Sequence, residues 1–192
     1  MKKFILASNS PRRKELLGNC GYTFEVRPSE CDESISENLT PQEAVMELSK
    51  RKAMAVLAEM GDCVVLGCDT VVAVDGRILG KPSDRQDAFN MIMSLSGKKH
   101  IVSTGVCIAD SSRCVTFENT TEVEFYPLSE ETVNSYLDTG EYTDKAGSYG
   151  IQGYGSVLVK GIKGDYFSVM GLPVSECARV LADFGIQGKV SI

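Results

Sequence analysis

Hydrophobic residues recur along the chain with two different periods, which predicts strands and helices in alternation. Short apolar runs bounded by turn residues are typical of buried strands, and alternating apolar and polar residues are typical of half-exposed strands. The pair Asp75-Gly76 lies between two apolar runs and predicts a hairpin turn. We expect strands at 3–7, 22–26, 63–68, 71–79 (as the hairpin), 101–109, 115–125 and 157–162.

Helix start signals lie between these strands. Thr40 and Glu43 form a capping box around a first-turn proline, and the apolar positions that follow have the helical period as far as Gly61. Other helices are expected to open at Ser10-Pro11, Ser83-Asp84, Ser129 and Pro173. Helices and strands thus interleave, but the hairpin and the long alternating strands indicate a mixed sheet. The prediction is a single α/β domain over residues 1–192, with a mixed, twisted β-sheet and flanking helices.

Composition and charge limit the class of protein. Of 192 residues, 43% are hydrophobic and 24% are charged, which is typical of a globular protein and not of a disordered chain. The net charge of -6 argues against a nucleic-acid polymer or an anionic membrane as partner. The apolar run at the N-terminus is too short for an export signal, and no run is long enough to cross a bilayer. We therefore expect a cytoplasmic protein.

The cysteine and histidine content limits the kinds of catalytic or metal site that the chain can form. The seven cysteines are odd in number and have no C-x-x-C pair, so they are interpreted as small hydrophobic residues in a reducing compartment. The single histidine, His100, lies at a predicted strand start. A zinc site with several histidines is excluded, and a Ser-His-Asp triad would have to use His100. The remaining chemistry uses carboxylates, cations and a hard metal ion.

The first candidate segment lies where the N-terminal strand meets the first helix. Ser8 and Ser10 precede Arg12 and Arg13, which fall in the first helical turn. Cations at this end oppose the helix dipole, and a bound phosphate removes that conflict. The segment therefore predicts a phosphate site, with a solvated basic patch as the alternative.

The second candidate is Asp69, which interrupts two apolar runs at the predicted exit of a strand. A carboxylate there is costly unless it has a use, such as holding a divalent cation or accepting a proton from water. The alternative is a structural turn residue.

Two lysines and a glutamine complete the candidates. Lys81 lies in a segment that resembles a Walker A loop, but the glycine spacing is one residue short and Pro82 replaces the hydroxyl residue. Lys81 and Lys52 could each point at a phosphate or be solvated surface residues. Gln152 lies among four glycines, where backbone could approach a flat base and the amide could both donate and accept.

In this order, the segments resemble the Maf family of nucleotide pyrophosphatases over essentially the whole chain. The segments that carry the resemblance are Leu6-Ala7-Ser8-Asn9-Ser10-Pro11-Arg12-Arg13, Asp32-Glu33, Lys50-Arg51-Lys52-Ala53, Gly67-Cys68-Asp69-Thr70-Val71-Val72, Leu79-Gly80-Lys81-Pro82, Asp144-Lys145-Ala146-Gly147-Ser148-Tyr149-Gly150-Ile151-Gln152-Gly153 and Gly171-Leu172-Pro173. The family implies two lobes around a central cleft, similar to the inosine triphosphate pyrophosphatases, and a homodimer. One departure is Ser168, where the family often has asparagine before the valine.

The resemblance also implies roles for individual residues. Asp69 resembles the proton acceptor, and Glu33 an acidic partner that helps Asp69 to hold the metal, which would be magnesium or manganese. The residues that resemble the triphosphate-contacting set are Ser8, Arg12, Arg13, Lys52 and Lys81. Arg12, Thr70 and Gln152 resemble the branch that acts on dTTP and UTP.

The sequence therefore predicts metal-dependent hydrolysis of a pyrimidine nucleoside triphosphate to its monophosphate and pyrophosphate. Two alternatives stay open. One is a nucleotide-binding regulator of cell division with little or no hydrolysis, and the other is a phosphatase that releases orthophosphate.

Overall fold

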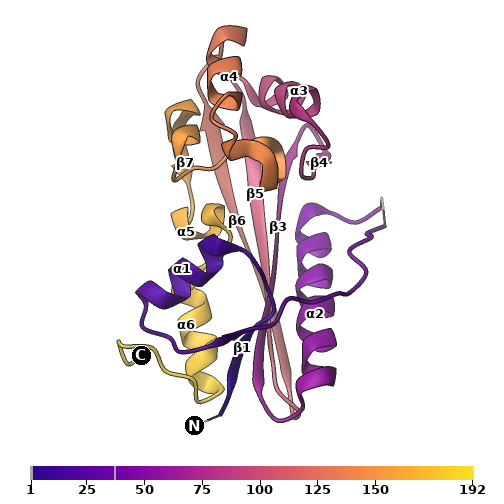
Figure 1. The fold of residues 1–192 in the computed structure, drawn as a ribbon, viewed down its shortest axis with the longest axis vertical. Helices are drawn as coiled ribbons and strands as arrows, with labels where there is room; N and C mark the ends of the chain where they lie inside the picture. The colour runs from indigo at the N-terminus through magenta and orange to yellow at the C-terminus, as the bar shows by residue number, and fades with distance from the viewer. Residues whose placement is uncertain (1, 37) are drawn as a thin grey trace. The chain divides into compact units, whose positions relative to one another are not determined.

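The strands come together in one mixed sheet. A computed structural model describes residues 2–36 and 38–192 (Figure 1). In these residues the sheet has seven strands in the order β2-β1-β3-β5-β6-β7, and β4 pairs with β3. The strands are β1 (Phe4–Leu6), β2 (Glu25–Val26), β3 (Val64–Val74), β4 (Arg77–Leu79), β5 (Lys99–Ala109), β6 (Cys114–Phe125) and β7 (Val159–Lys163). β1 runs parallel to β2 and β3, whereas β3–β4 and β6–β7 are antiparallel, so the predicted mixed α/β fold is confirmed.

Helices and short 3₁₀ turns connect the strands. The α-helices are α1 (Pro11–Asn19), α2 (Pro41–Met60), α3 (Arg85–Leu95), α4 (Glu130–Leu137), α5 (Tyr166–Met170) and α6 (Val174–Asp183), and the 3₁₀ helices are η1 (Glu141–Asp144), η2 (Ala146–Ser148) and η3 (Tyr154–Leu158). In the described part of the chain, none of the helices combines the length and hydrophobicity that a bilayer span requires.

The chain divides into two compact units, and β3, β5 and β6 contribute residues to both. The first unit consists of Met1–Asp69, Thr104–Asn119 and Gly171–Ile192, and the second of Thr70–Ser103 and Thr120–Met170.

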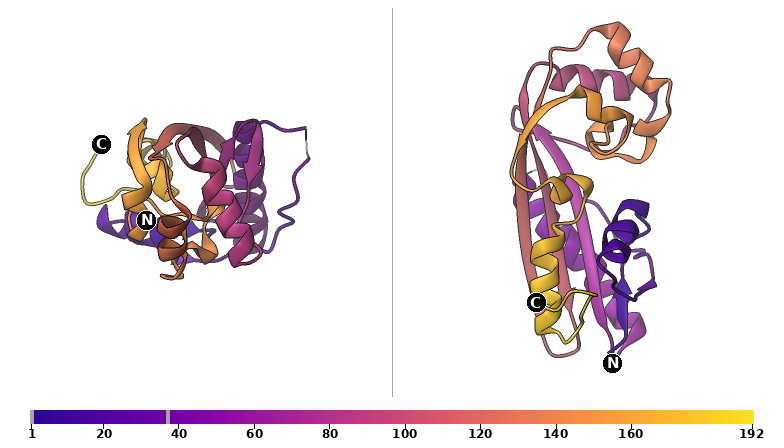
Figure 2. Two further views of the ribbon diagram at one scale, coloured as in Figure 1. Left: turned by 90° about the horizontal axis from the view of Figure 1, so that it is seen from above. Right: turned by 90° about the vertical axis from the view of Figure 1, so that its left-hand side faces the viewer.

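In the first unit, α2 and α6 cover opposite faces of the strands (Figures 1 and 2). Two glycines let α2 approach the sheet closely. A Cβ atom added to Gly67 would lie 2.3 Å from the backbone oxygen of Ser49, and one added to Gly105 would lie 2.3 Å from that of Val45. Any larger residue at either position would push α2 away from the strands.

Local capping chemistry explains where the helices begin. Thr40 and Glu43 form the predicted capping box at the start of α2, because each side chain bonds to the other's backbone N–H. Asp84 caps α3 and Ser129 caps α4 through bonds of 2.8 and 3.1 Å to backbone N–H groups. Ser10 is the N-cap residue of α1, but its side chain makes no capping bond.

The second unit holds the predicted hairpin and the histidine. Asp75 and Gly76 have φ values of 50° and 77°, which suit the tight turn between β3 and β4. α3 packs against α4 and η2. His100, on β5, is 3% exposed, and its ring centroid lies 4.9 Å from that of Phe125 and 5.5 Å from that of Tyr149.

Three predicted boundaries are wrong. The strand expected to end at residue 68 continues without a break to Val74, so Asp69 lies inside a strand and not at its exit. β2 covers only Glu25–Val26, because those are the residues that pair with β1. The strand expected at 157–162 begins at Val159, because Tyr154–Leu158 first makes a 3₁₀ turn.

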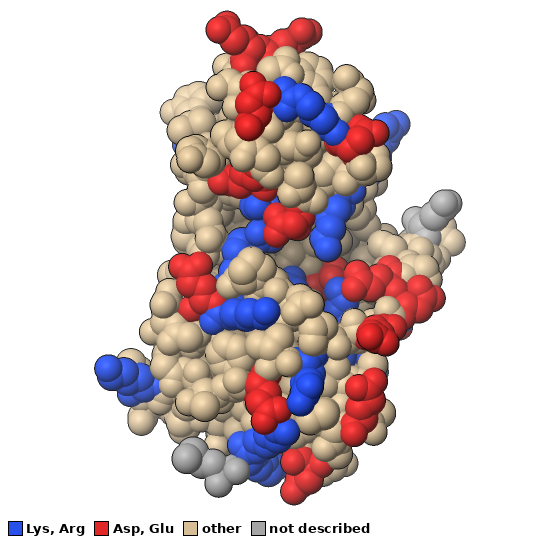
Figure 3. Space-filling view, viewed as in Figure 1, with Lys and Arg blue, Asp and Glu red and all other residues tan. Residues whose placement is uncertain are grey.

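Charged side chains of both signs are interspersed over the face shown in Figure 3. Acidic groups lie beside basic ones there, without a continuous basic stripe. The whole sequence has a net charge of -6.

Candidate functional site

Asp69 faces α2 because of its place in β3. Successive side chains of a strand point to opposite faces, so Asp69 shares its face with Gly67, two residues earlier. Gly67 is one of the two glycines at which α2 approaches the sheet closely, and a Cβ atom there would contact Ala53. The next residue back along α2, Lys52, therefore meets the carboxylate of Asp69.

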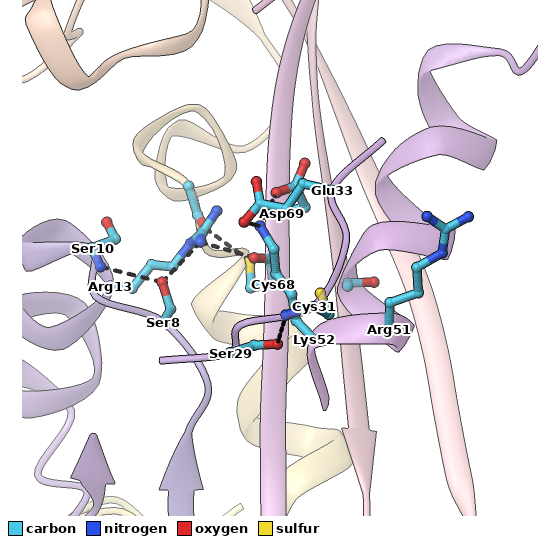
Figure 4. A network of polar contacts seen from close by, with 12 residues as sticks. Ser8, Ser10, Arg13, Ser29, Cys31, Glu33, Arg51, Lys52, Cys68 and Asp69 are labelled. Carbon is cyan, nitrogen blue, oxygen red and sulfur yellow. Dashed lines mark hydrogen bonds and ion pairs between the residues drawn. The ribbon is translucent and has the colours of Figure 1, made fainter. Parts of the chain in front are cut away.

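Lys52 is held between two carboxylates (Figure 4). Its Nζ lies 2.6 Å from Oδ1 of Asp69 and 3.1 Å from Oε1 of Glu33. The side chains of Lys52 and Asp69 are 11% and 14% exposed, whereas that of Glu33 is 59% exposed. The Asp69 bond is thus the more shielded from solvent, and ion pairs are stronger in such surroundings.

The two carboxylates keep Lys52 charged. Burial by itself lowers the pKa of a lysine, but the charges of Asp69 and Glu33, and their hydrogen bonds, outweigh burial and raise the pKa of Lys52 above its usual value. At neutral pH the site therefore contains a fixed ammonium ion beside two acidic side chains.

Arg51 holds the segment that carries Glu33. Its Nη1 donates to the carbonyl oxygens of Asp32 (3.4 Å) and Ser34 (2.7 Å), and its Nε donates to Glu47 one turn away on α2. The carboxylate of Asp32 closes a local turn by accepting from the backbone N–H and the hydroxyl of Ser34. These bonds place Glu33 over the next residue of α2, Lys52.

Arg13 connects α1 with the strand that carries Asp69 (Figure 4). Its Nη1 donates to the Ser8 hydroxyl at 3.0 Å and to the Cys68 carbonyl at 2.9 Å, and its Nε donates to the Gly171 carbonyl at 2.9 Å. The thiol of Cys68 also donates to the Gly171 carbonyl, at 3.1 Å. Burial raises the pKa of that thiol to about 11, so it stays protonated.

The N-terminus of α1 lies next to these bonds. Pro11 occupies the first turn, and the backbone N–H of Ser10 donates to the Ser8 hydroxyl at 3.2 Å. The first turn has no acidic residue, and Arg12 in that turn is half-buried. Helix N-termini of this kind attract anions, because their N–H groups lack partners within the helix.

The structure thus brings together Ser8, Arg13, Glu33, Lys52 and Asp69, which we call the Asp69 cluster. All five residues belong to the first unit. Three other predicted site residues belong to the second unit. Thr70 is the residue after Asp69 in β3, Lys81 is exposed in the loop after β4, and Gln152 is exposed in the glycine-rich segment.

The donor set of the Asp69 cluster fits a hard divalent metal. Asp69 and Glu33 both lie within ion-pair distance of Lys52 Nζ, and carboxylate oxygens are the ligands that magnesium and manganese prefer. Within residues 2–36 and 38–192, no group of three or more His, Cys, Asp or Glu side chains could form a cage by itself. Magnesium sites with one or two carboxylates usually complete their coordination with water and substrate phosphates.

Arg51, Cys68 and Gly171 were quoted within sequence motifs, but none of the three was singled out. Arg51 was quoted only as part of a motif, yet it positions Glu33. Cys68 and Gly171 are linked through a thiol–carbonyl bond although they are 103 residues apart. Neither residue type carries a signal for such a contact, because the partner is a backbone carbonyl that any residue would supply.

Comparisons with known proteins show what the chain as a whole is similar to. Residues 3–184 match the family model described as Maf-like protein. A Bacillus velezensis protein named dTTP/UTP pyrophosphatase is 50% identical over 186 residues, covering 97% of this chain and 98% of that protein. A Bacillus cereus protein of the same name is 51% identical over 187 residues, covering 97% of this chain and 92% of that protein. A Bacillus pumilus protein, also of that name, is 48% identical over 186 residues.

Proposed function

Since this chain belongs to the Maf family, we propose that it hydrolyses dTTP and UTP between the α- and β-phosphates. The products are the nucleoside monophosphate and pyrophosphate. The names of its relatives support this substrate class. The observation that carries the proposal is the ammonium of Lys52, fixed between Asp69 and Glu33 in the unit that contains the N-terminus of α1.

Positive groups bind the triphosphate on an acidic protein. A nucleoside triphosphate carries about four negative charges at neutral pH, and cations next to it stabilise the charge that grows on the leaving group. Ser8, Arg12 and the backbone N–H groups of α1 bind phosphate oxygens, and Lys52 adds its fixed charge. Arg13 orders this surface through its bonds to Ser8, Cys68 and Gly171.

Asp69 is the proton acceptor in the proposed reaction. A water oxygen forms a bond to the α-phosphorus, and the bond from that phosphorus to the bridging oxygen breaks. Pyrophosphate leaves with the electron pair, and the water proton passes to the Asp69 carboxylate. Lys52 holds this carboxylate in place through the 2.6 Å bond to Oδ1.

Magnesium or manganese is proposed as the cofactor, with Asp69 and Glu33 as its protein ligands. When bound, it would neutralise phosphate charge and polarise the phosphoryl oxygens. The donor type supports the assignment, because carboxylate oxygens are the ligands that these ions prefer.

Base choice is assigned to Arg12, Thr70 and Gln152, and a further phosphate contact to Lys81. An exposed glutamine amide carries a donor and an acceptor side by side, which matches the N3–H and O4 groups of uracil and thymine. The family resemblance also supports a homodimer that works in the cytoplasm.

A product assay tests this function. The full-length protein is incubated with UTP, dTTP, CTP or GTP, with magnesium or manganese, and pyrophosphate and orthophosphate are measured separately. We expect pyrophosphate equal in amount to UMP or dTMP, and slower release from CTP and GTP. Orthophosphate as the first product would overturn the proposal in favour of a phosphatase. Nucleotide binding without turnover would favour the regulatory alternative.

A further inference from the structure

Glu141, which the proposed reaction does not use, holds the segment that carries Gln152. It opens η1, and its carboxylate accepts three hydrogen bonds. The backbone N–H of Tyr154 donates to Oε2 at 2.7 Å, and that of Gly155 donates to Oε1 at 3.1 Å. The hydroxyl of Tyr136 also donates to Oε1, at 3.3 Å. One half-buried side chain thus fixes two consecutive amides just after Gln152.

The two amides are the first N–H groups of η3, so Glu141 acts as a remote helix cap. The residue at the N-cap position, Gly153, has no side chain with which to cap the turn. A carboxylate at this end of a helix is favoured by the exposed N–H groups and by the local dipole. Bonds of a charged acceptor to N–H donors are stronger than neutral ones.

Glycines in this segment make room for the carboxylate and its neighbour. A Cβ atom on Gly153 would lie 1.9 Å from Oε2 of Glu141. A Cβ atom on Gly150 would lie 2.7 Å from Cε of Lys145, whose ammonium donates to the Glu141 carbonyl. Gln152 therefore lies between two glycines. Gly153 is close to Glu141 in η1, and Gly150 is close to Lys145, the residue after η1.

The segment has one buried side, with Ile151 and Leu158, and one side that is open to solvent. Tyr154 is 67% exposed and Val157 is 71% exposed. Both border an open pocket of about 730 Å³ that Glu141 and Gly153 also line. On the open side of the segment, the hydrogen bonds of Glu141 hold the backbone at Tyr154 and Gly155.

The orientation of the Gln152 amide decides which pyrimidine it can pair with. Uracil and thymine present an acceptor at position 4, whereas cytosine presents a donor there. The backbone at Gln152 decides whether the amide can reach position 4 of the base at all, and an amide out of reach cannot discriminate between the bases.

We propose that Glu141 is a positioning residue for base selection, which acts through Gln152 without touching the substrate. This proposal rests on the proposed function, because Gln152 is the residue that reads the base in that scheme.

The first test compares Glu141→Gln and Glu141→Ala with the wild type in kcat and KM for UTP and CTP. Loss of the capping charge should raise KM for UTP and reduce the preference for UTP over CTP about tenfold, which corresponds to the loss of about one charge-assisted hydrogen bond. Glu131→Gln is the control, because Glu131 is an exposed glutamate that lines the same pocket. It should leave both constants unchanged.

The second test uses the contact with Gly153. Gly153→Ala should impair base preference in the wild-type background, because its Cβ atom would collide with Oε2 of Glu141. In the Glu141→Ala background the collision is gone, so the added effect of Gly153→Ala should be much smaller. Additive effects in this double-mutant cycle would overturn the proposal.

Hydrogen exchange separates this proposal from the proposed function. In Glu141→Ala the amides of Tyr154 and Gly155 should exchange faster, whether or not the protein is an enzyme. If the wild type releases no pyrophosphate from UTP, the proposed function fails while this readout still tests Glu141. If the wild type is active and Glu141→Gln keeps its KM, its base preference and its amide protection, the positioning role is refuted. Thermal melting of each variant identifies a general loss of folding, and the double-mutant cycle then decides.

Discussion

The ion pair between Lys52 and Asp69 sets the chemistry of the site at the scale of single residues. Lys52 stays charged because two carboxylates raise its pKa against the opposing effect of burial. In the proposed reaction, its ammonium serves both as a phosphate ligand and as the group that orients the carboxylate of Asp69. A neutral residue of similar length at position 52 would leave two acidic groups facing each other without a counter-charge.

Asp69→Asn tests the proton acceptor. An amide keeps an oxygen that can accept from Lys52 but cannot take a proton from water, so turnover of UTP should fall by at least about a hundredfold. Nucleotide binding should persist, since the change removes one negative charge. Steady-state kinetics and equilibrium binding of UTP measure the two effects, with Asp62→Asn, an exposed aspartate before β3, as control. A rate near that of the wild type would remove Asp69 from the mechanism.

At the scale of elements, the match between β3 and α2 creates the site. Gly67 lets the helix come close, and this approach brings Lys52 against Asp69. The contact is therefore a product of backbone packing as well as of charge attraction.

Gly67→Ala tests that packing. The new Cβ atom would lie 2.3 Å from the Ser49 oxygen and 2.6 Å from the Ala53 nitrogen, so the helix has to move. We expect a loss of about 1–3 kcal/mol in the free energy of unfolding. Turnover should fall about tenfold or more, because small displacements of catalytic groups are costly.

Gly18→Ala is the matched control, because a Cβ atom on this α1 residue meets no heavy atom within 4 Å. Urea denaturation and UTP hydrolysis of both variants give the comparison. Equal stability and equal rates in the two would show that the close approach of α2 has no role.

The elements also show what the sequence could predict. Thr40, Asp84 and Ser129 were identified as caps because a cap depends on residues three or four positions away, and the Asp75-Gly76 turn is equally local. The unbroken course of β3 was missed, because the polar pair Asp69-Thr70 resembles a strand end. The predicted hairpin with β4 pairs only Val72–Val74, and β3 also lies next to β5 in the sheet, a neighbour that a local sequence pattern does not reveal.

The site was predicted as a set of residues but not as a set of contacts. Family resemblance pointed to Lys52, Glu33 and Asp69 separately. The bond between Arg13 and Gly171 joins residues 158 positions apart and uses a backbone carbonyl. The identity of the side chain at position 171 therefore does not predict it. The cap that Glu141 provides to η3 could not be predicted from side chains either, because its donors are backbone amides.

At the scale of the whole molecule, the single histidine links stability to pH. Nε2 of His100 lies 2.8 Å from the Tyr149 hydroxyl, and its Nδ1 has no hydrogen-bond partner among the described residues. A charged ring would carry a second N–H without an acceptor. Burial lowers the pKa of His100 from 6.5 to about 4, so the folded protein holds the ring in its neutral form.

Stability should consequently fall on mild acidification. Between pH 6.5 and pH 4 the unfolded chain binds a proton at His100 that the folded protein does not bind, so the stabilisation is complete above pH 6.5 and is lost as the pH falls. The expected loss is about 2 kcal/mol between pH 7 and pH 5. Urea denaturation across this range measures it, and His100→Gln should remove this part of the pH dependence. Identical slopes for the two proteins would show that the ring is not buried in its neutral form.

Because side chains alternate along β3, an insertion or deletion before Asp69 affects the site differently when it has an odd or an even number of residues. Gly67 and Asp69 face α2, while Cys68 between them bonds to the Gly171 carbonyl. Deleting or inserting one residue between Val64 and Asp69 would leave the apolar content of the strand almost unchanged, yet would turn the carboxylate away from Lys52. Odd-length indels upstream of Asp69 should therefore be eliminated in a functional selection, and even-length ones should survive more often.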